Sequence, residues 1–166
     1  MTSDTQANPL LQDWSTPFGL PPFSAISTDH YKDAFEQALT AHRAEINAIA
    51  SAQDAATFEN TILALEVAGE KLTRVGTTFW VLSGAHTNPD MQGLEREFAP
   101  KVTAHMNAIT SNQSLFARID AVNAAADTLD LNAEQKQLLK RTHRSFVRAG
   151  AQLDAQNKKK LNEITE

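Results

Sequence analysis

The five histidines are the first residues whose chemistry could define a function, because imidazole is the commonest metal ligand and titrates near neutral pH. None is followed by glutamate and none has a second histidine four residues later, so the H-E-x-x-H signature of zinc peptidases is absent from this sequence. The Glu-x-x-His spacing of di-iron helical bundles is absent as well. We therefore interpret the histidines as surface or packing residues, and we expect His42 and His105, which lie on apolar stripes, to be buried.

Paired carboxylates, phosphate-binding loops and thiols offer no catalytic site either. Glu95 and Glu97 are two residues apart, and such positions on a helix point about 200° away from each other, so we interpret them as a solvated face. Neither G-x-G-x-x-G nor G-x-x-x-x-G-K-[ST] occurs; Gly69 and Gly76, seven apart, predict close helix–helix contact instead. There is no cysteine, which excludes disulfides and thiol catalysis. We therefore predict no catalytic, cofactor-binding or metal-binding residue in this sequence.

Composition predicts a soluble, acidic, globular protein of about one domain. The 166 residues carry a net charge of −5, with 42% hydrophobic and 21% charged residues. This balance lacks the basic field that nucleic-acid binding requires, and we interpret the basic residues between 141 and 160 as a solvated or ion-pairing face. The N-terminus has no signal-like apolar region, and apolar runs reach about four residues against the roughly 20 of a membrane span. We expect a cytoplasmic protein with no nucleic-acid or membrane partner.

Residues 1–27 form a proline-rich leader in which regular helix is blocked. Apolar residues alternate with its prolines more densely than in a solvated tail; they are Leu10, Leu11, Trp14, Phe18, Leu20, Phe23 and Ile26. We predict an extended strap that lies on a hydrophobic surface of the helices.

From residue 28 onward, apolar residues recur every three or four positions, which is typical of amphipathic helices. We expect helices over about 28–49, 57–82, 88–109, 114–127 and 132–150. Thr57 and Asn88 are suited to cap two of them, Asn132 and Gln135 have capping-box spacing, and Gly150 suits a helix end. No strand signal is present. The predicted class is all-α: a multi-helix bundle of antiparallel helices with the extended N-terminal strap.

The last segment, residues 154–166, begins like a further helix and stops without glycine or proline. From these residues alone, a truncated helix and a frayed natural end are equally good interpretations.

Short motifs in a fixed order along nearly the whole chain resemble one known family. They are Asn8-Pro9-Leu10-Leu11, Thr16-Pro17-Phe18, Pro21-Pro22-Phe23, Thr57-Phe58-Glu59-Asn60-Thr61, Gly84-Ala85-His86-Thr87-Asn88, Glu97-Phe98-Ala99-Pro100-Lys101, Leu115-Phe116-Ala117-Arg118-Ile119 and Phe146-Val147-Arg148-Ala149-Gly150-Ala151. Together they resemble the N-terminal region of the thimet oligopeptidase family of zinc metallopeptidases, and most closely its bacterial peptidyl-dipeptidase (dipeptidyl carboxypeptidase) branch.

The resemblance implies a large helical enzyme whose zinc, held by two histidines and a glutamate, is bound outside this segment. Its N-terminal helices would form one wall of a channel that admits short peptides, and the peptidyl-dipeptidase branch would release C-terminal dipeptides; the oligopeptidase branch stays open. Residues 28–166 would then be a helical N-terminal domain truncated before the catalytic domain, its partner, and inactive alone. The alternative is a stand-alone helical peptide-binding or interaction module without catalysis.

Overall fold

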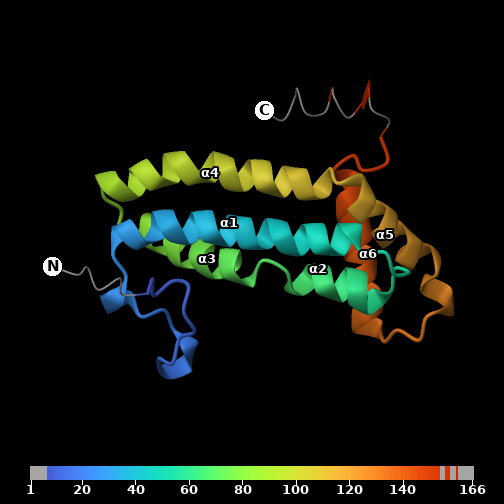
Figure 1. Ribbon diagram of the computed structural model, residues 1–166, viewed down its shortest axis with the longest axis horizontal. Helices are drawn as coiled ribbons and strands as arrows, with labels where there is room; N and C mark the ends of the chain where they lie inside the picture. The colour runs from blue at the N-terminus through green and yellow to red at the C-terminus, as the bar shows by residue number, and fades with distance from the viewer. Residues whose placement is uncertain (1–6, 154–155, 158–159, 161–166) are drawn as a thin grey trace. The chain divides into compact units, whose positions relative to one another are not determined.

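The computed structural model describes residues 7–153, 156–157 and 160, and this part of the chain is all-α with no strand (Figure 1). Its helices are α1 (Thr28–Ser51), the π-helical turn η3 (Phe58–Leu63), α2 (Ala64–Val67), α3 (Glu70–Ala85), α4 (Pro89–Thr110), α5 (Gln113–Ala124) and α6 (Ala133–Arg148). Short 3-10 turns lie at η1 (Pro17–Gly19), η2 (Phe23–Ala25) and η4 (Ala126–Thr128). Among the described helices, none has the length and apolar character needed to cross a membrane. The predicted all-α multi-helix fold is confirmed.

Capping residues begin and end the helices where the sequence indicates. The Asn132 side chain accepts a hydrogen bond from the backbone N–H of Gln135 at 2.9 Å, and the Gln135 side chain accepts one from the N–H of Asn132 at 3.0 Å. Thr57 forms the same reciprocal pair of hydrogen bonds with Asn60 at the start of η3, and the Asn88 side chain accepts one from the backbone N–H of Met91 at the start of α4. Gly150 follows α6 with a φ of 87°, a conformation that favours glycine. These local signals fix the helix boundaries because they satisfy backbone N–H groups that no helical carbonyl reaches.

The helix expected over 57–82 is not continuous. Its first residues form the π-helical turn, and the chain breaks at Gly69, which has a φ of 77° before α3 begins. A Cβ at Gly69 would lie 2.8 Å from ring atoms of His42 on α1, so the predicted close approach of two helices is confirmed here. At Gly76 the nearest atoms to a Cβ belong to Trp80 of the same helix, at 3.7 Å. The close helix–helix contact predicted at Gly76 is therefore wrong.

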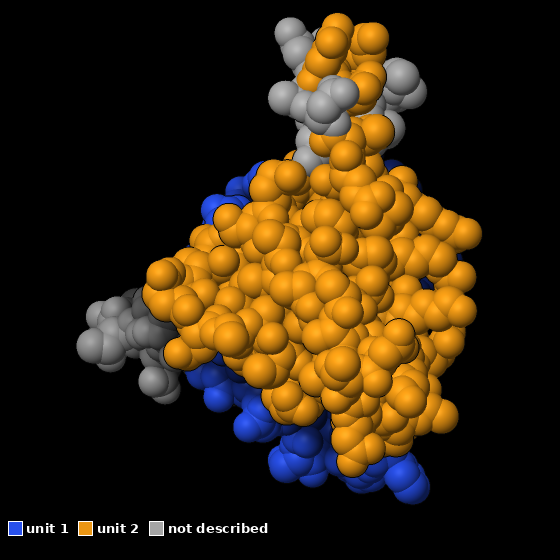
Figure 2. Space-filling model, turned by 90° about the vertical axis from the view of Figure 1, so that its right-hand side faces the viewer, with its two compact units in different colours: residues 1–44, 69–103 blue, residues 45–68, 104–166 orange. Residues whose placement is uncertain are grey.

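The chain divides into two compact units, each with its own hydrophobic core (Figure 2). Unit 1 comprises residues 1–44 and 69–103, and unit 2 comprises residues 45–68 and 104–166, so α1 and α4 contribute residues to both. In unit 1, α3 runs antiparallel to α1 and α4 (Figure 1). The boundary between a leader, 1–27, and a helical domain, 28–166, stays a prediction. The further helix expected over 154–166 lies almost wholly outside the described residues.

The core of unit 1 joins the leader to three helices. Its fully buried large side chains are Leu10 of the leader, Tyr31 and Phe35 of α1, Val75 and Phe79 of α3, and Phe98 of α4. The core of unit 2 is built from the C-terminal part of α1, the π-helical turn, α5 and α6; its large fully buried side chains are Ile62, Leu115, Ile119 and Val122.

The proline-rich leader packs on unit 1 in its first part only. Leu10 is fully buried, and Leu11 and Ile26 pack against the same core. Phe18, in contrast, is 99% exposed and has a φ of 60°, because the tight turn formed with Gly19 directs its ring away from the protein. The predicted strap is therefore confirmed in part: it is interrupted by 3-10 turns and lifts from the surface around Phe18.

Candidate functional site

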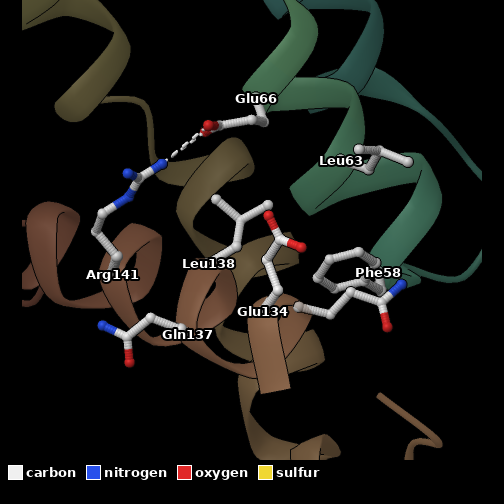
Figure 3. Close-up of a pocket in the computed structure, with 8 residues that line it drawn as sticks. Phe58, Leu63, Glu66, Glu134, Gln137, Leu138 and Arg141 are labelled. Atoms are coloured by element: carbon white, nitrogen blue, oxygen red, sulfur yellow. Dashed lines mark hydrogen bonds and ion pairs between the residues drawn. The ribbon is translucent and has the colours of Figure 1, made fainter. Parts of the chain in front are cut away.

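A groove in unit 2 lies between the η3–α2 segment and α6 (Figure 3). Its volume is about 470 Å³, within the range of roughly 300–1,000 Å³ that is usual for ligand pockets. The lining side chains are Phe58, Leu63, Glu66, Glu134, Gln135, Gln137, Leu138 and Arg141. An apolar floor edged by charged and amide groups is suited to binding an extended segment with both apolar and polar parts.

An ion pair joins the two walls of the groove. Nη2 of Arg141 on α6 lies 2.9 Å from Oε1 and 3.0 Å from Oε2 of Glu66 on α2. Both side chains are about half exposed, at 59% and 47%, so the pair contributes little to stability, about 0–1 kcal/mol. The pair links the α2 wall to the α6 wall.

Glu134 is the charged residue of the groove without an internal partner. It lies in the first turn of α6 and makes no hydrogen bond or ion pair with any other described residue. Figure 3 shows its carboxylate turned into the space between α6 and the η3–α2 wall, between Leu138 and Phe58 in that view. An unpaired carboxylate beside apolar surface can bind a cation whose stem is apolar.

The wall that carries Phe58 is held in place by Arg118 of α5. Nη1 of Arg118 donates to the carbonyl oxygens of Ala52 and Asp54, each at 2.9 Å, and Nη2 donates to Oδ1 of Asn60 at 3.0 Å. The same Asn60 oxygen accepts from the backbone N–H of Thr57, and Asn60 Nδ2 donates to a carbonyl of the preceding loop. A guanidinium is needed here because its planar fork reaches several acceptors at once. Its Nε is buried with no hydrogen-bond partner among the described residues.

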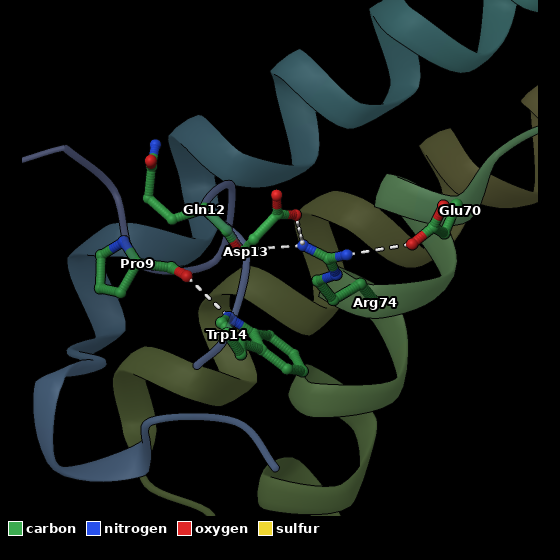
Figure 4. Close-up of polar contacts among 6 residues, drawn as sticks. All are labelled: Pro9, Gln12, Asp13, Trp14, Glu70 and Arg74. Atoms are coloured by element: carbon green, nitrogen blue, oxygen red, sulfur yellow. Dashed lines mark hydrogen bonds and ion pairs between the residues drawn. The ribbon is translucent and has the colours of Figure 1, made fainter. Parts of the chain in front are cut away.

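In unit 1, Arg74 of α3 holds the leader (Figure 4). Its Nη1 donates to the carbonyl of Gln12 at 2.9 Å and lies 3.6 Å from the Asp13 carboxylate, while Nη2 donates to Glu70 one turn earlier at 3.0 Å. The guanidinium also lies 5.1 Å from the centre of the Trp14 ring, and Trp14 Nε1 donates to the carbonyl of Pro9 at 2.9 Å. These contacts fix the leader against α3.

A smaller cavity of about 240 Å³ in unit 1 is lined by Tyr31 and by residues that include Phe23, Leu82 and Met91. Tyr31 is 1% exposed, and its hydroxyl has no hydrogen-bond partner among the described residues. Burial removes water from the phenolate and raises the pKa of Tyr31 to about 12. The hydroxyl therefore stays neutral and available as a donor at any physiological pH.

The structure gives the burial or the contacts of three histidines and of the acidic pair. His42 and His105 are buried, at 8% and 6% exposure, as expected. His143 Nε2 lies 2.9 Å from the Asp120 carboxylate. Glu95 and Glu97 have separate partners: Glu95 accepts from Ser83 at 2.8 Å, and a hydrogen bond from Lys101 at 2.8 Å lowers the pKa of Glu97. In the described ranges no three His, Asp or Glu side chains lie close enough together to hold a metal ion.

Sequence reasoning placed no function on Glu134, Arg118 or Arg74, and it interpreted Arg141 only as part of a solvated or ion-pairing face. The ion pair of Arg141 with Glu66 agrees with that interpretation. The groove itself left no signal in the sequence, because its walls are 75 residues apart at the ion pair.

Comparison with known proteins gives a consistent result along the chain, although no family model matches it. The dipeptidyl carboxypeptidases of Escherichia coli and Salmonella typhimurium are 41% and 40% identical over 95% and 93% of this chain. Oligopeptidase A of Salmonella typhimurium is 25% identical over 95% of it. The chain matches the N-terminal region of this peptidase family. It spans 23%, 23% and 22% of the length of these three curated relatives.

Proposed function

We propose that this chain is the N-terminal helical part of a peptidase that cleaves short peptides and releases dipeptides from their C-termini. The supporting observation is the 41% identity to a dipeptidyl carboxypeptidase over 95% of the chain, against 25% for oligopeptidase A over the same share. This difference in identity favours the peptidyl-dipeptidase branch. The helices would serve as a wall that limits access to short, unfolded peptides, in the cytoplasm.

Zinc would be the metal of the intact enzyme, bound outside this segment. The described residues do not fit such a site, because they contain no group of three suitable side chains and the sequence has no H-E-x-x-H motif. The role of this chain would therefore lie in binding and excluding molecules, and the hydrolytic step would belong to the catalytic domain, its partner.

The test compares the native gene product with the 166-residue chain. An antibody raised against the chain would isolate the native product from a lysate, and both would be incubated with an octapeptide that has a blocked N-terminus and a free C-terminus, and the products would be identified by mass spectrometry. We expect the native product to be several times larger than 18.2 kDa and to release a C-terminal dipeptide in a chelator-sensitive reaction, while the chain alone releases none.

Three results would overturn parts of this proposal. Internal cleavage without dipeptide release would assign the oligopeptidase branch. Chelator-sensitive hydrolysis by the 166-residue chain would contradict its inactivity. A native product of the size of the chain with no hydrolysis would favour the alternative, a stand-alone peptide-binding or interaction module, and cell fractionation would test the cytoplasmic location independently.

A further inference from the structure

We propose that the groove between the η3–α2 segment and α6 binds a lysine or arginine side chain of a short peptide, with Glu134 as the partner of the cationic group. The inference rests on the proposed function only in taking the ligand to be a peptide. Recognition of the basic side chain is argued from the groove alone.

The charges of the groove favour a cation. Its lining contains two carboxylates, Glu66 and Glu134, and one guanidinium, Arg141. Because both oxygens of Glu66 contact Nη2 of Arg141, these two charges neutralise each other within the walls. The remaining charge is that of Glu134, which is exposed and has no partner among the described residues. A basic group entering the groove therefore finds an unpaired carboxylate, whereas an acidic group would have to compete with Glu66 for Arg141.

The floor of the groove suits the stem of a long basic side chain. Phe58 and Leu138 line it, and Leu63, which is 43% exposed, extends the apolar surface at the rim. Lysine and arginine bury their methylene groups on apolar surface while the charged end reaches a polar partner. The arrangement of Glu134 between Leu138 and Phe58 in Figure 3 provides both contacts in one place.

A purely structural role for Glu134 makes a different prediction. A carboxylate in the first turn of a helix is stabilised by the helix dipole, so Glu134 could serve α6 alone. In that case Glu134→Gln would lower the stability of the helix slightly and would leave peptide binding unchanged. The two roles are therefore separated by a binding measurement.

The experiment is a titration of the 166-residue chain with acetyl-Ala-Lys-Ala-amide, followed by ¹H–¹⁵N NMR. The comparison peptide carries norleucine in place of lysine, which keeps the apolar stem and removes the charge. We expect saturable shifts of backbone signals around Phe58 and in the first turns of α6. The lysine peptide should bind about five-fold more tightly than the norleucine peptide, which is the effect of one partly exposed ion pair.

Two variants complete the test. In Glu134→Gln the advantage of lysine should disappear, so that both peptides bind alike, while Glu36→Gln, an exposed glutamate of α1 in unit 1, should keep the five-fold difference. Equal binding of both peptides to the unaltered chain, no shifts at millimolar peptide, or tighter binding of a glutamate-containing peptide would overturn the inference. Because no hydrolysis is measured, these results are independent of whether the native protein is a peptidase.

Discussion

Replacing Gly69 by alanine tests whether the break between α2 and α3 is enforced by the backbone and by the ring of His42. Two penalties are expected. An alanine with a φ near 77° costs about 1–2 kcal/mol because its Cβ crowds the following carbonyl. The new Cβ would also lie 2.8 Å from Cε1 and Nδ1 of His42, which is 8% exposed and has little room to move, and such overpacking costs about 1–3 kcal/mol.

The same substitution elsewhere in unit 1 should have the opposite effect. Gly93 lies inside α4, and a Cβ there would meet no atom within 4 Å. Gly93→Ala should therefore raise the free energy of unfolding by about 0.5–1 kcal/mol, since alanine loses less backbone entropy than glycine when a helix forms. The pair of variants holds the chemical change constant and varies only the site.

Urea unfolding followed by tryptophan fluorescence is the appropriate assay, because both tryptophans, Trp14 and Trp80, lie in unit 1 together with Gly69. We expect Gly69→Ala to lower the free energy of unfolding by about 2–5 kcal/mol, the sum of the two penalties. A double-mutant cycle with His42→Ala separates the two penalties: the clash should vanish in the double variant and give a coupling of about 1–3 kcal/mol.

Two results would refute this reasoning. If Gly69→Ala stabilises the protein as Gly93→Ala does, then the chain tolerates a continuous helix and the break is not enforced. If the cycle shows no coupling, the ring of His42 does not oppose a side chain at residue 69, and the φ angle alone accounts for the glycine.

Three further predictions concern single side chains. Arg118→Met should lower the free energy of unfolding by about 2–3 kcal/mol in urea titrations followed by circular dichroism. Arg118→Lys should recover less than half of this loss, because one ammonium cannot reach the three acceptors. Tyr31, the only tyrosine, should ionise near pH 12 in the folded chain and near 10 in urea when followed by absorbance at 295 nm. Since its folded pKa is the higher one, the stability it provides is complete well below pH 10 and falls by about 2 kcal/mol as the pH rises to 12. Arg74→Ala should release the leader, seen as a red shift and faster acrylamide quenching of Trp14 in a Trp80→Phe background, whereas Arg74→Lys should retain part of the contact.

Helix positions and caps could be predicted from the sequence because they depend on interactions within a few residues. The capping box of Asn132 and Gln135 requires a spacing of three and a hydrogen bond in each direction, and both are local. Burial of His42 followed from its position on an apolar stripe for the same reason. The break at Gly69 was not predicted, because a glycine within a helical pattern is compatible with a continuous helix. The His42 ring that a Cβ at residue 69 would meet lies 27 residues earlier in the chain, beyond the reach of a local pattern.

The candidate groove could not be predicted, because it exists only where distant segments meet. Glu134 lies between the predicted capping residues Asn132 and Gln135, and Phe58 stands in one of the ordered motifs, but neither pattern indicates that they line one space. Figure 3 shows the side chains of the two walls converging, and their separation along the chain explains why no local motif records it. Arg118 had a signal only in the ordered motifs that carry the family resemblance.

By itself, the sequence determined the helical class, most helix boundaries, the resemblance to a peptidase family and the absence of a zinc motif within these 166 residues, since each depends on residue type and short spacing. Only the tertiary structure decided which part of the leader is buried, where the second helix breaks, and which charges remain unpaired. Leu10 is buried and Phe18 is exposed although both are apolar residues of the same proline-rich segment. Leu10 packs against the helices of unit 1, whereas Phe18 stands in the turn with Gly19 and points away from them, and residue type does not encode this difference.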